Sequence, residues 1–244
     1  MLLLHFLPFM KELTENAFMY AANSVTNTFY YTIPALLNAS LVLLFAGRDY
    51  IGKANIRQIF REPKLRYSIL LLVIYLAINS DMFQSILLIA YIASVLMIYM
   101  IDDIKGEVKL FLMFCRKNII WLGVIIIWLL SLLMESQGGR ATDVQFSGSF
   151  LLAVGEIIKV LVDTVKGLNH LFVLMFVVIE GFAVILFLFS KRTRTDRDKE
   201  YMRLTMIYFI SLLITVAYLV LVCARVGAHY FRRSDVFQGS YFMQ

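Results

Sequence analysis

Long continuous apolar runs, separated by short clusters of charged residues, dominate the pattern along this chain. A helix needs roughly 20 mostly apolar residues to cross the hydrocarbon core of a bilayer. Strands of a transmembrane barrel would instead alternate apolar and polar residues over about 10 positions. The pattern therefore predicts an all-α protein, a polytopic transmembrane helical bundle of about six crossings at residues 27–46, 67–79, 85–101, 119–134, 171–189 and 204–223.

The second run, residues 67–79, is short, and only Ser80–Gln84 separates it from the third. It fits either one arm of a tight helical hairpin or part of a broken re-entrant element. The basic residues decide between these, because loops rich in Lys and Arg stay on the cytoplasmic side. Most of the 23 Lys and Arg residues fall in three loops, and these share one side only if residues 67–101 cross twice. Six crossings then place both termini on the outer face. The three loops are Arg48–Arg66, Asp102–Asn118 and Ser190–Arg203.

One further helix is expected on the outer face, at residues 147–163. Its apolar residues recur at helical spacing, with Glu156, Lys159 and Asp163 opposite them, so it should lie in the membrane interface rather than span it. Residues 1–10 are apolar but too short to cross, which suits an interfacial helix or the remnant of a crossing. Because no internal repeat or linker is visible, residues 1–244 should form a single membrane domain. That domain is either the whole protein or the C-terminal part of a longer or split one.

Composition supports lipid as the solvent, and the position of the charges restricts the partners. Hydrophobic residues make up 61% of the chain, charged residues 16%, and the mean hydropathy is +0.78. The net charge of +6 lies mainly in the predicted loops, as a topology signal does, so nucleic acid is not an expected partner. Cys115 and Cys223 fall on opposite membrane faces in this topology, so we expect no disulfide between them.

Motifs of soluble enzymes are absent from the sequence. The chain has no dinucleotide fingerprint, Walker loop, nucleophile elbow or zincin helix, and its three histidines are too far apart to predict a metal site. The missing Walker loop excludes ATP-driven transport by this chain alone. No catalytic residue can be assigned from these patterns.

Glu180 is the one acidic residue in the middle of a predicted crossing. A charge at that depth costs about 2.5–3.5 kcal/mol unless it is paired or protonated. It fits a proton or cation relay in a transporter or flippase-like protein. It also fits a protonated side chain that hydrogen-bonds a neighbouring helix, with Gly181 allowing close approach.

Arginine and aromatic residues border the predicted outer face. Arg140 follows Gly138-Gly139 after the fourth crossing, and Arg232 and Arg233 follow the sixth. The planar guanidinium suits bidentate binding of phosphate, although interfacial Arg also anchors helices to headgroups. Tyr30 and Tyr31 near the start of the first crossing suit an aromatic belt.

Four short motifs together resemble the later part of a family of bacterial membrane proteins. They are Asn27-x-x-Tyr30-Tyr31-x-x-Pro34, Asn79-Ser80-Asp81, Gly138-Gly139-Arg140 and Tyr230-Phe231-Arg232-Arg233-Ser234. The chain resembles polytopic glycosyltransferase-like proteins of the GT-C type, among them the glucosyltransferases that modify O-antigen and wall polymers in the cytoplasmic (inner) membrane. The resemblance implies a polyprenyl-phosphate sugar as substrate at the outer face and inverting glycosyl transfer, with a carboxylate as general base. No cofactor is firmly implied, and a divalent cation on the phosphate is compatible.

The resemblance also implies roles for residues of this chain. Arg140 and Arg233, with Arg232, would contact the phosphate, while Tyr30, Tyr31 and His229 would line the sugar or acceptor cleft.

The chain departs from that family at its start. GT-C enzymes usually keep an essential acidic residue in a first outer loop, where this chain offers only Glu12 and Glu15 outside any such motif. A substrate-binding half, completed by another membrane protein, is therefore implied more readily than a whole enzyme. The rival hypotheses are a transporter or flippase-like protein that uses Glu180, and a non-catalytic membrane subunit. Glu180→Gln should abolish transport and spare glycosyl transfer, whereas Arg140→Ala should do the reverse.

Overall fold

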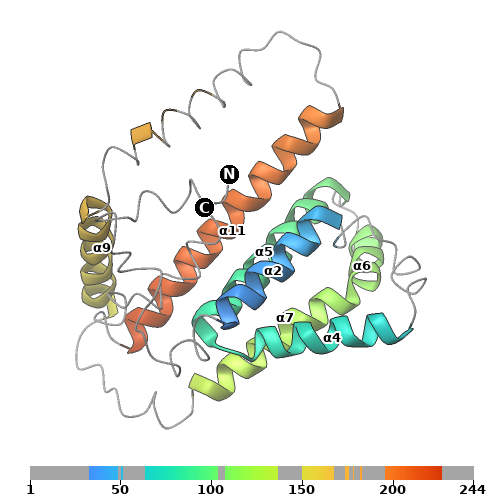
Figure 1. Cartoon of the computed structure of the whole chain (residues 1–244), viewed down its shortest axis with the longest axis horizontal. Coiled ribbons are helices and arrows are strands. Elements are labelled where there is room, and N and C mark those ends of the chain that lie inside the picture. The colour runs from blue at the N-terminus through green and yellow to red at the C-terminus, as the bar shows by residue number, and fades with distance from the viewer. Residues whose placement is uncertain are drawn as a thin grey trace.

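The described part of the chain is entirely helical (Figure 1). The computed structural model describes residues 33–48, 51, 64–103, 108–136, 150–167, 174, 175, 178, 182 and 196–226. Within these residues there are seven helices and no strand, which confirms the predicted all-α class. The helices are α2 (Ile33–Arg48), α4 (Lys64–Ile78), α5 (Met82–Asp103), α6 (Val108–Lys117), α7 (Ile119–Ser136), α9 (Phe150–Gly167) and α11 (Asp196–Val226).

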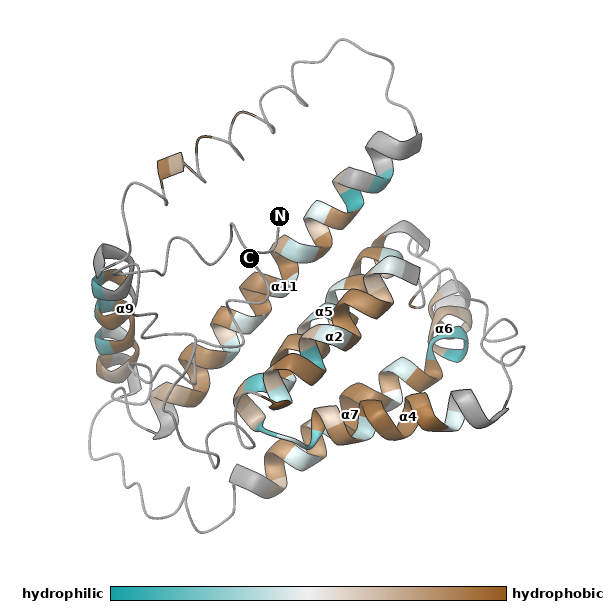
Figure 2. Cartoon of the chain, in the orientation of Figure 1, coloured by the Kyte–Doolittle hydropathy of each residue, from teal (hydrophilic) through white to brown (hydrophobic). Residues whose placement is uncertain are grey.

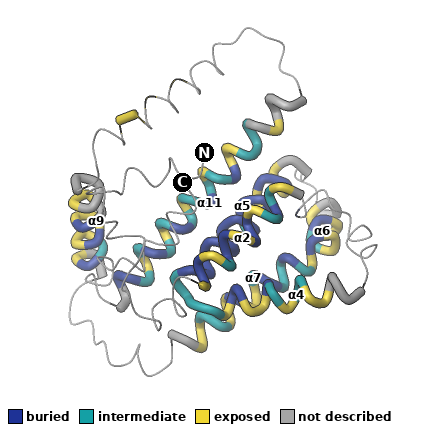
Figure 3. Tube along the Cα trace, viewed as in Figure 1, coloured by how far each residue is buried: buried dark blue, intermediate teal, exposed yellow. Residues whose placement is uncertain are grey.

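Helix α5 is the centre of the bundle. It contacts α2, α4, α6, α7 and α11, and every residue from Gln84 to Ile92 is buried (Figure 3). Hydrophobic residues run along most of α4, α5 and α7, with hydrophilic residues at the turn between α4 and α5 (Figure 2). A helix that is apolar on all sides is typical of a protein interior or a membrane. The outer helices α4 and α7 keep many of these apolar side chains exposed, as a lipid-facing surface requires.

Contacts along α5 fix the direction of α11. Near the start of α11, the Arg203 side chain contacts Tyr99 at the end of α5. Near its other end, the Tyr218 hydroxyl donates a hydrogen bond to the carbonyl oxygen of Met82, 3.1 Å away, at the start of α5. Helices α5 and α11 are therefore antiparallel.

Helix α7 is also antiparallel to α5, whereas α2 runs with α5. The indole nitrogen of Trp128, in the second half of α7, lies 2.8 Å from Ser85 Oγ at the start of α5. At the opposite end, Phe45 of α2 meets Trp121 of α7 edge to face, with ring centroids 5.3 Å apart. The bundle thus has two ends. We call the end that carries the α4–α5 turn the tip end, and the end where α2 and α5 finish and α7 and α11 begin the basic end.

The short run at 67–79 forms one arm of a helical hairpin. Helices α4 and α5 are joined by Asn79, Ser80 and Asp81, and α5 begins at Met82, earlier than the predicted residue 85. Asp81 is the cause of this earlier start, because its Oδ2 accepts hydrogen bonds from the backbone N–H groups of Phe83 and Gln84, both at 3.1 Å. These donors would otherwise lack partners in the first turn of a helix.

Loss of this N-cap should weaken the hairpin. Asp81→Ala is expected to lower the free energy of unfolding by about 0.5–2 kcal/mol, because it leaves N–H groups of the first turn without an acceptor. Asp81→Asn keeps a side-chain oxygen at the same place and should retain most of the stability. Unfolding of the full chain in mixed detergent micelles would measure both variants. Equal losses in the two variants would show that charge, and not capping, is what matters.

Two of the described helices are long and apolar enough to cross a membrane. Met82–Ile101 in α5 and Met202–Ala224 in α11 are each long enough, and the bent pair of Phe111–Lys117 with Ile119–Met134 makes a third if it is counted as one span. The apolar parts of α2 and α4 are shorter, at Ile33–Gly47 and Ser68–Ile78. The described helices therefore support two or three crossings. Most of the predicted crossing at 171–189 lies outside the described residues.

The helix predicted near 147–163 is present as α9, and it packs on α11, a contact that the sequence analysis did not predict. Ala153, Ile157 and Val160 are buried, and they pack against the last turns of α11 around Cys223. Small residues allow the two helices to approach closely. A second difference is α6, an additional helix inside the predicted loop at 102–118.

Candidate functional site

The residues that the sequence nominated for substrate binding lie outside the described part of the chain, and so does Glu180. The nominated residues are Tyr30, Tyr31, Arg140, His229, Arg232 and Arg233. The helices that they flank are described, however, and those helices have known directions. Tyr30 and Tyr31 precede α2, and Arg140 follows α7. The other three, His229, Arg232 and Arg233, follow α11. The start of α2 and the ends of α7 and α11 all lie at the tip end (Figure 1).

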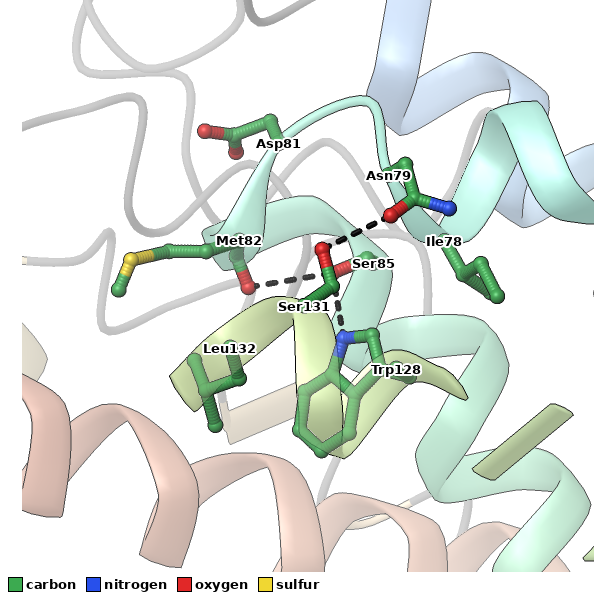
Figure 4. Close-up of a pocket in the computed structure, with 8 residues that line it drawn as sticks. All are labelled: Ile78, Asn79, Asp81, Met82, Ser85, Trp128, Ser131 and Leu132. Atoms are coloured by element: carbon green, nitrogen blue, oxygen red, sulfur yellow. Dashed lines mark hydrogen bonds between the residues drawn. The ribbon is translucent and has the colours of Figure 1, made fainter. Parts of the chain in front are cut away.

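A small pocket lies at this tip end, between the α4–α5 turn and α7. We call it the tip pocket (Figure 4). The centres of water molecules can occupy about 20 Å³ of it, which is room for about one bound water. It is therefore too small for a sugar ring. Its lining residues are Ile78, Asn79, Asp81, Met82, Ser85, Trp128, Ser131 and Leu132.

Two side-chain hydrogen bonds across the tip pocket connect α7 to the hairpin. The Ser131 hydroxyl donates to Asn79 Oδ1 over 2.8 Å, and the Trp128 indole N–H donates to Ser85 Oγ over 2.8 Å. Both are drawn as dashed lines in Figure 4. The Trp128 ring also packs on Tyr218 of α11, with centroids 5.3 Å apart. Contacts at the tip pocket thus join α7 to the α4–α5 hairpin, and the Trp128 ring joins α7 to α11.

Asp81 is the one acidic residue that lines the tip pocket. Its carboxylate caps α5, and Figure 4 shows it directed away from Trp128 and Ser131. A negative charge at this place also interacts favourably with the N-terminal end of the helix dipole. The geometry therefore gives Asp81 a structural role in the turn. Among the described residues, no group of three or more His, Cys, Asp or Glu side chains is arranged to hold a metal ion.

A polar contact between α5 and α11, which the sequence analysis did not identify, lies in the middle of the bundle. Ser211 Oγ lies 2.9 Å from Ser94 Oγ, and each hydroxyl is also 2.7 Å from a carbonyl oxygen one turn earlier in its own helix. Interhelical hydroxyl contacts of this kind hold membrane helices together. The signal was present as two pairs of small residues four positions apart, Ala90 with Ser94 and Ser211 with Thr215.

The sequence analysis also missed a buried amide side chain. Asn38 is completely buried in α2, and its Nδ2 donates to the carbonyl oxygen of Pro34 at 2.9 Å and to that of Ala77 in α4 at 3.2 Å. The second bond joins the start of α2 to the end of α4, next to the turn. A lone Asn inside an apolar run was the only available signal.

Comparisons of the chain with protein-family models, with curated proteins and with solved structures found no match. The arrangement of the described helices is therefore the basis for a functional hypothesis. At the tip end, the described start of α2 and the described ends of α7 and α11 lie together.

Proposed function

We propose that this chain is a multi-pass protein of the bacterial inner membrane that binds a polyprenyl-phosphate-linked sugar at its outer face, for assembly or modification of surface polysaccharide. One observation carries the proposal. The three helix ends that lead into Tyr30 and Tyr31, into Arg140, and into His229 with Arg232 and Arg233 share the tip end of the bundle. In the proposed topology this shared end of the three helices faces the outer side of the membrane.

The direction of the helices supports six crossings in the proposed membrane topology. Helices α2, α4, α5 and α7 alternate in direction, and α11 runs the same way as α7. This order requires one more crossing between α7 and α11, and we propose the run at 171–189 for it. Basic residues gather at the end away from the tip, at Arg48, Lys64, Arg116, Lys117 and Arg203. Because basic segments remain in the cytoplasm, the tip end is outside and so are both termini.

The chemistry of the nominated residues suits a lipid-linked phosphate. Arg140 follows α7 after two glycines, and a guanidinium there can bind two phosphate oxygens at once. Arg233 and Arg232 provide the same fork after α11, while the tyrosines and His229 offer aromatic faces and hydrogen bonds to a sugar. The general base is not assigned to this chain. Another membrane protein as a partner, and a divalent cation on the phosphate, fit this proposal.

The test is a change in the surface polysaccharide. A deletion strain would be complemented with wild type, with Arg140→Ala, and with Lys159→Ala as a control at an exposed site on α9. A hydrogen bond to a charged group contributes about 1.5–3 kcal/mol, so we expect Arg140→Ala to lower the sugar substituent by about tenfold or more. Mass spectrometry of the polysaccharide measures the substituent, and immunoblots of membranes confirm equal amounts of protein.

The two outcomes separate the competing functions. Loss of one substituent in the deletion strain, restored by wild type and Lys159→Ala only, would support the glycosyl-transfer role and make Arg140 a binding residue. An unchanged polysaccharide in the deletion strain would overturn that role. The remaining hypotheses would then be the transporter that uses Glu180 and the non-catalytic subunit.

A further inference from the structure

Helix α6 has exposed side chains of two kinds, apolar and basic. Leu112 and Met113 are 63% and 60% exposed, with Phe111 beside them, and Arg116 and Lys117 are exposed in its last turn. Among residues 111–117, the part of α6 whose side chains the structure describes, Phe114 alone is buried, and it joins the hydrophobic core. Such a surface would be unfavourable in water alone. It is typical of a helix that lies in the interface of a membrane.

The orientation of α6 is fixed by a buried bend. The axis of Phe111–Lys117 meets that of Ile119–Met134 at 78°, with Asn118 between them. Asn118 is buried, and its Nδ2 donates to the carbonyl oxygen of Phe114 at 3.1 Å. The backbone N–H of Asn118 donates to the same carbonyl oxygen over 3.0 Å, so two hydrogen bonds tie Asn118 to the last turn of α6. With Phe114 in the core as well, α6 is held at this angle to α7.

We propose that α6 is an interfacial helix that binds the anionic phospholipid headgroups of the membrane leaflet at the basic end. This inference rests on the membrane topology in the proposed function. At about 1.5 Å per residue, α7 alone approaches the thickness of the hydrocarbon core. In the proposed topology the bent pair is therefore not one span: α7 crosses by itself, and α6, at 78° to it, lies nearly parallel to the surface. Leu112 and Met113 then enter the upper acyl region, and Arg116 and Lys117 lie at the level of the phosphates.

Charge complementarity selects anionic lipid as the occupant of this surface. The sequence of α6 contains Lys109, Arg116 and Lys117 and no acidic residue. Basic residues near a membrane contribute about 1 kcal/mol each to binding of anionic lipid. The apolar side chains of α6 also continue directly into the exposed apolar surface of α7, which begins at Ile119. A single bilayer therefore covers both helices.

Depth in the membrane is the first test. The full chain with Cys115→Ala and Cys223→Ala would carry one new cysteine, Leu112→Cys, labelled with an environment-sensitive fluorophore, in vesicles of phosphatidylcholine and phosphatidylglycerol. We expect quenching by lipids with a nitroxide high on the acyl chain and little quenching by aqueous iodide. Ile126→Cys, on the exposed face of α7, is the control and should be quenched most by a nitroxide deep in the chain.

Headgroup preference is the second test, with the same label at residue 112. In an equal mixture of the two lipids, quenching should be several-fold stronger when phosphatidylglycerol carries the nitroxide than when phosphatidylcholine does. Arg116→Gln with Lys117→Gln should reduce this difference strongly, because each charge contributes about fivefold. Lys159→Gln, on α9, should leave the difference unchanged.

Each result either supports or overturns the inference. Iodide quenching at residue 112 but not at residue 126 would overturn the placement of α6 and leave the topology intact. Iodide quenching at both residues would overturn the topology and with it the basis of the proposed function. A label at 112 that neither lipid nor iodide reaches would show that protein covers α6. Equal quenching by both lipids in the wild-type protein would overturn the preference for anionic headgroups.

Discussion

Replacement of Trp128 by alanine is expected to lower the free energy of unfolding of the bundle by about 3 kcal/mol. Lipid solvates an apolar side chain nearly as well as a protein interior does, so little of the usual transfer term is lost in a membrane protein. The cavity remains, and a void of about 80 Å³ costs about 2 kcal/mol. Loss of the packing on Tyr218 adds about 0.5–1.5 kcal/mol, and loss of the hydrogen bond to Ser85 adds about 0.6 kcal/mol.

Two further variants separate these contributions. Trp128→Phe keeps an aromatic ring in the core and removes the indole N–H, so it should cost about 1 kcal/mol. Leu130→Ala, on the exposed face of the same helix, should change stability by less than about 0.5 kcal/mol. Reversible unfolding of the full chain in mixed micelles, followed by circular dichroism, measures all three. A loss in Trp128→Ala no larger than that in Leu130→Ala would contradict the packing of α7 against α5 and α11.

The apolar pattern predicted most of the described helices but not their ends. Predicted runs correspond to α2, α4, α5, α7 and α11, because a membrane helix needs a continuous apolar segment of a certain length. Their ends depend on local hydrogen bonds that hydropathy does not register. Asp81 advances the start of α5 by capping it, and α11 begins at Asp196 within a segment read as a basic loop. Helix α6 was missed for a related reason, since its apolar run is too short to suggest a crossing.

Contacts between helices were much harder to predict than the helices themselves. Ser94 and Ser211 are separated by 117 residues, and nothing in either apolar run states which neighbour its small residues face. The face of α9 shows the same limit. Nothing in its apolar spacing stated that the helix packs on α11, where Ala153 is completely buried because close approach of two helices favours small side chains.

For the candidate site too, residue type and charge could be read from the sequence, whereas contacts between helices could not. Residue type nominated Arg140 and Arg233, since a guanidinium after a crossing suits a phosphate. Topology, read from charge alone, already put both on one side of the membrane. The structure adds the directions of α7 and α11, fixed by the contacts of Ser85 with Trp128 and of Met82 with Tyr218, while the two arginines lie outside the described residues. The hydrogen bonds of the tip pocket were not foreseeable, because they depend on how three helices meet.

The basic end should also contain a position sensitive to truncation, at Phe45. This side chain is completely buried and meets Trp121 edge to face, which joins the end of α2 to the start of α7. Phe45→Ala is expected to cost about 2 kcal/mol, from a cavity of about 80 Å³ at about 24 cal/mol per Å³. Micelle unfolding would measure it beside Leu43→Ala, a variant on the exposed face of α2 that should be nearly neutral.

The size of this loss tests whether lipid is the solvent around the bundle. In a water-soluble protein, Phe→Ala in the core costs about 3–5 kcal/mol because the transfer of the ring from water is lost together with its packing. A bundle in lipid retains mainly the packing term, since its separated helices still keep the ring in an apolar medium. A loss near 2 kcal/mol, with Leu43→Ala close to zero, is therefore the signature of a membrane-embedded fold. Losses of about 4 kcal/mol in Phe45→Ala, with a substantial loss in Leu43→Ala as well, would show that water surrounds these side chains in the unfolded state. That result would argue against α2 as a crossing.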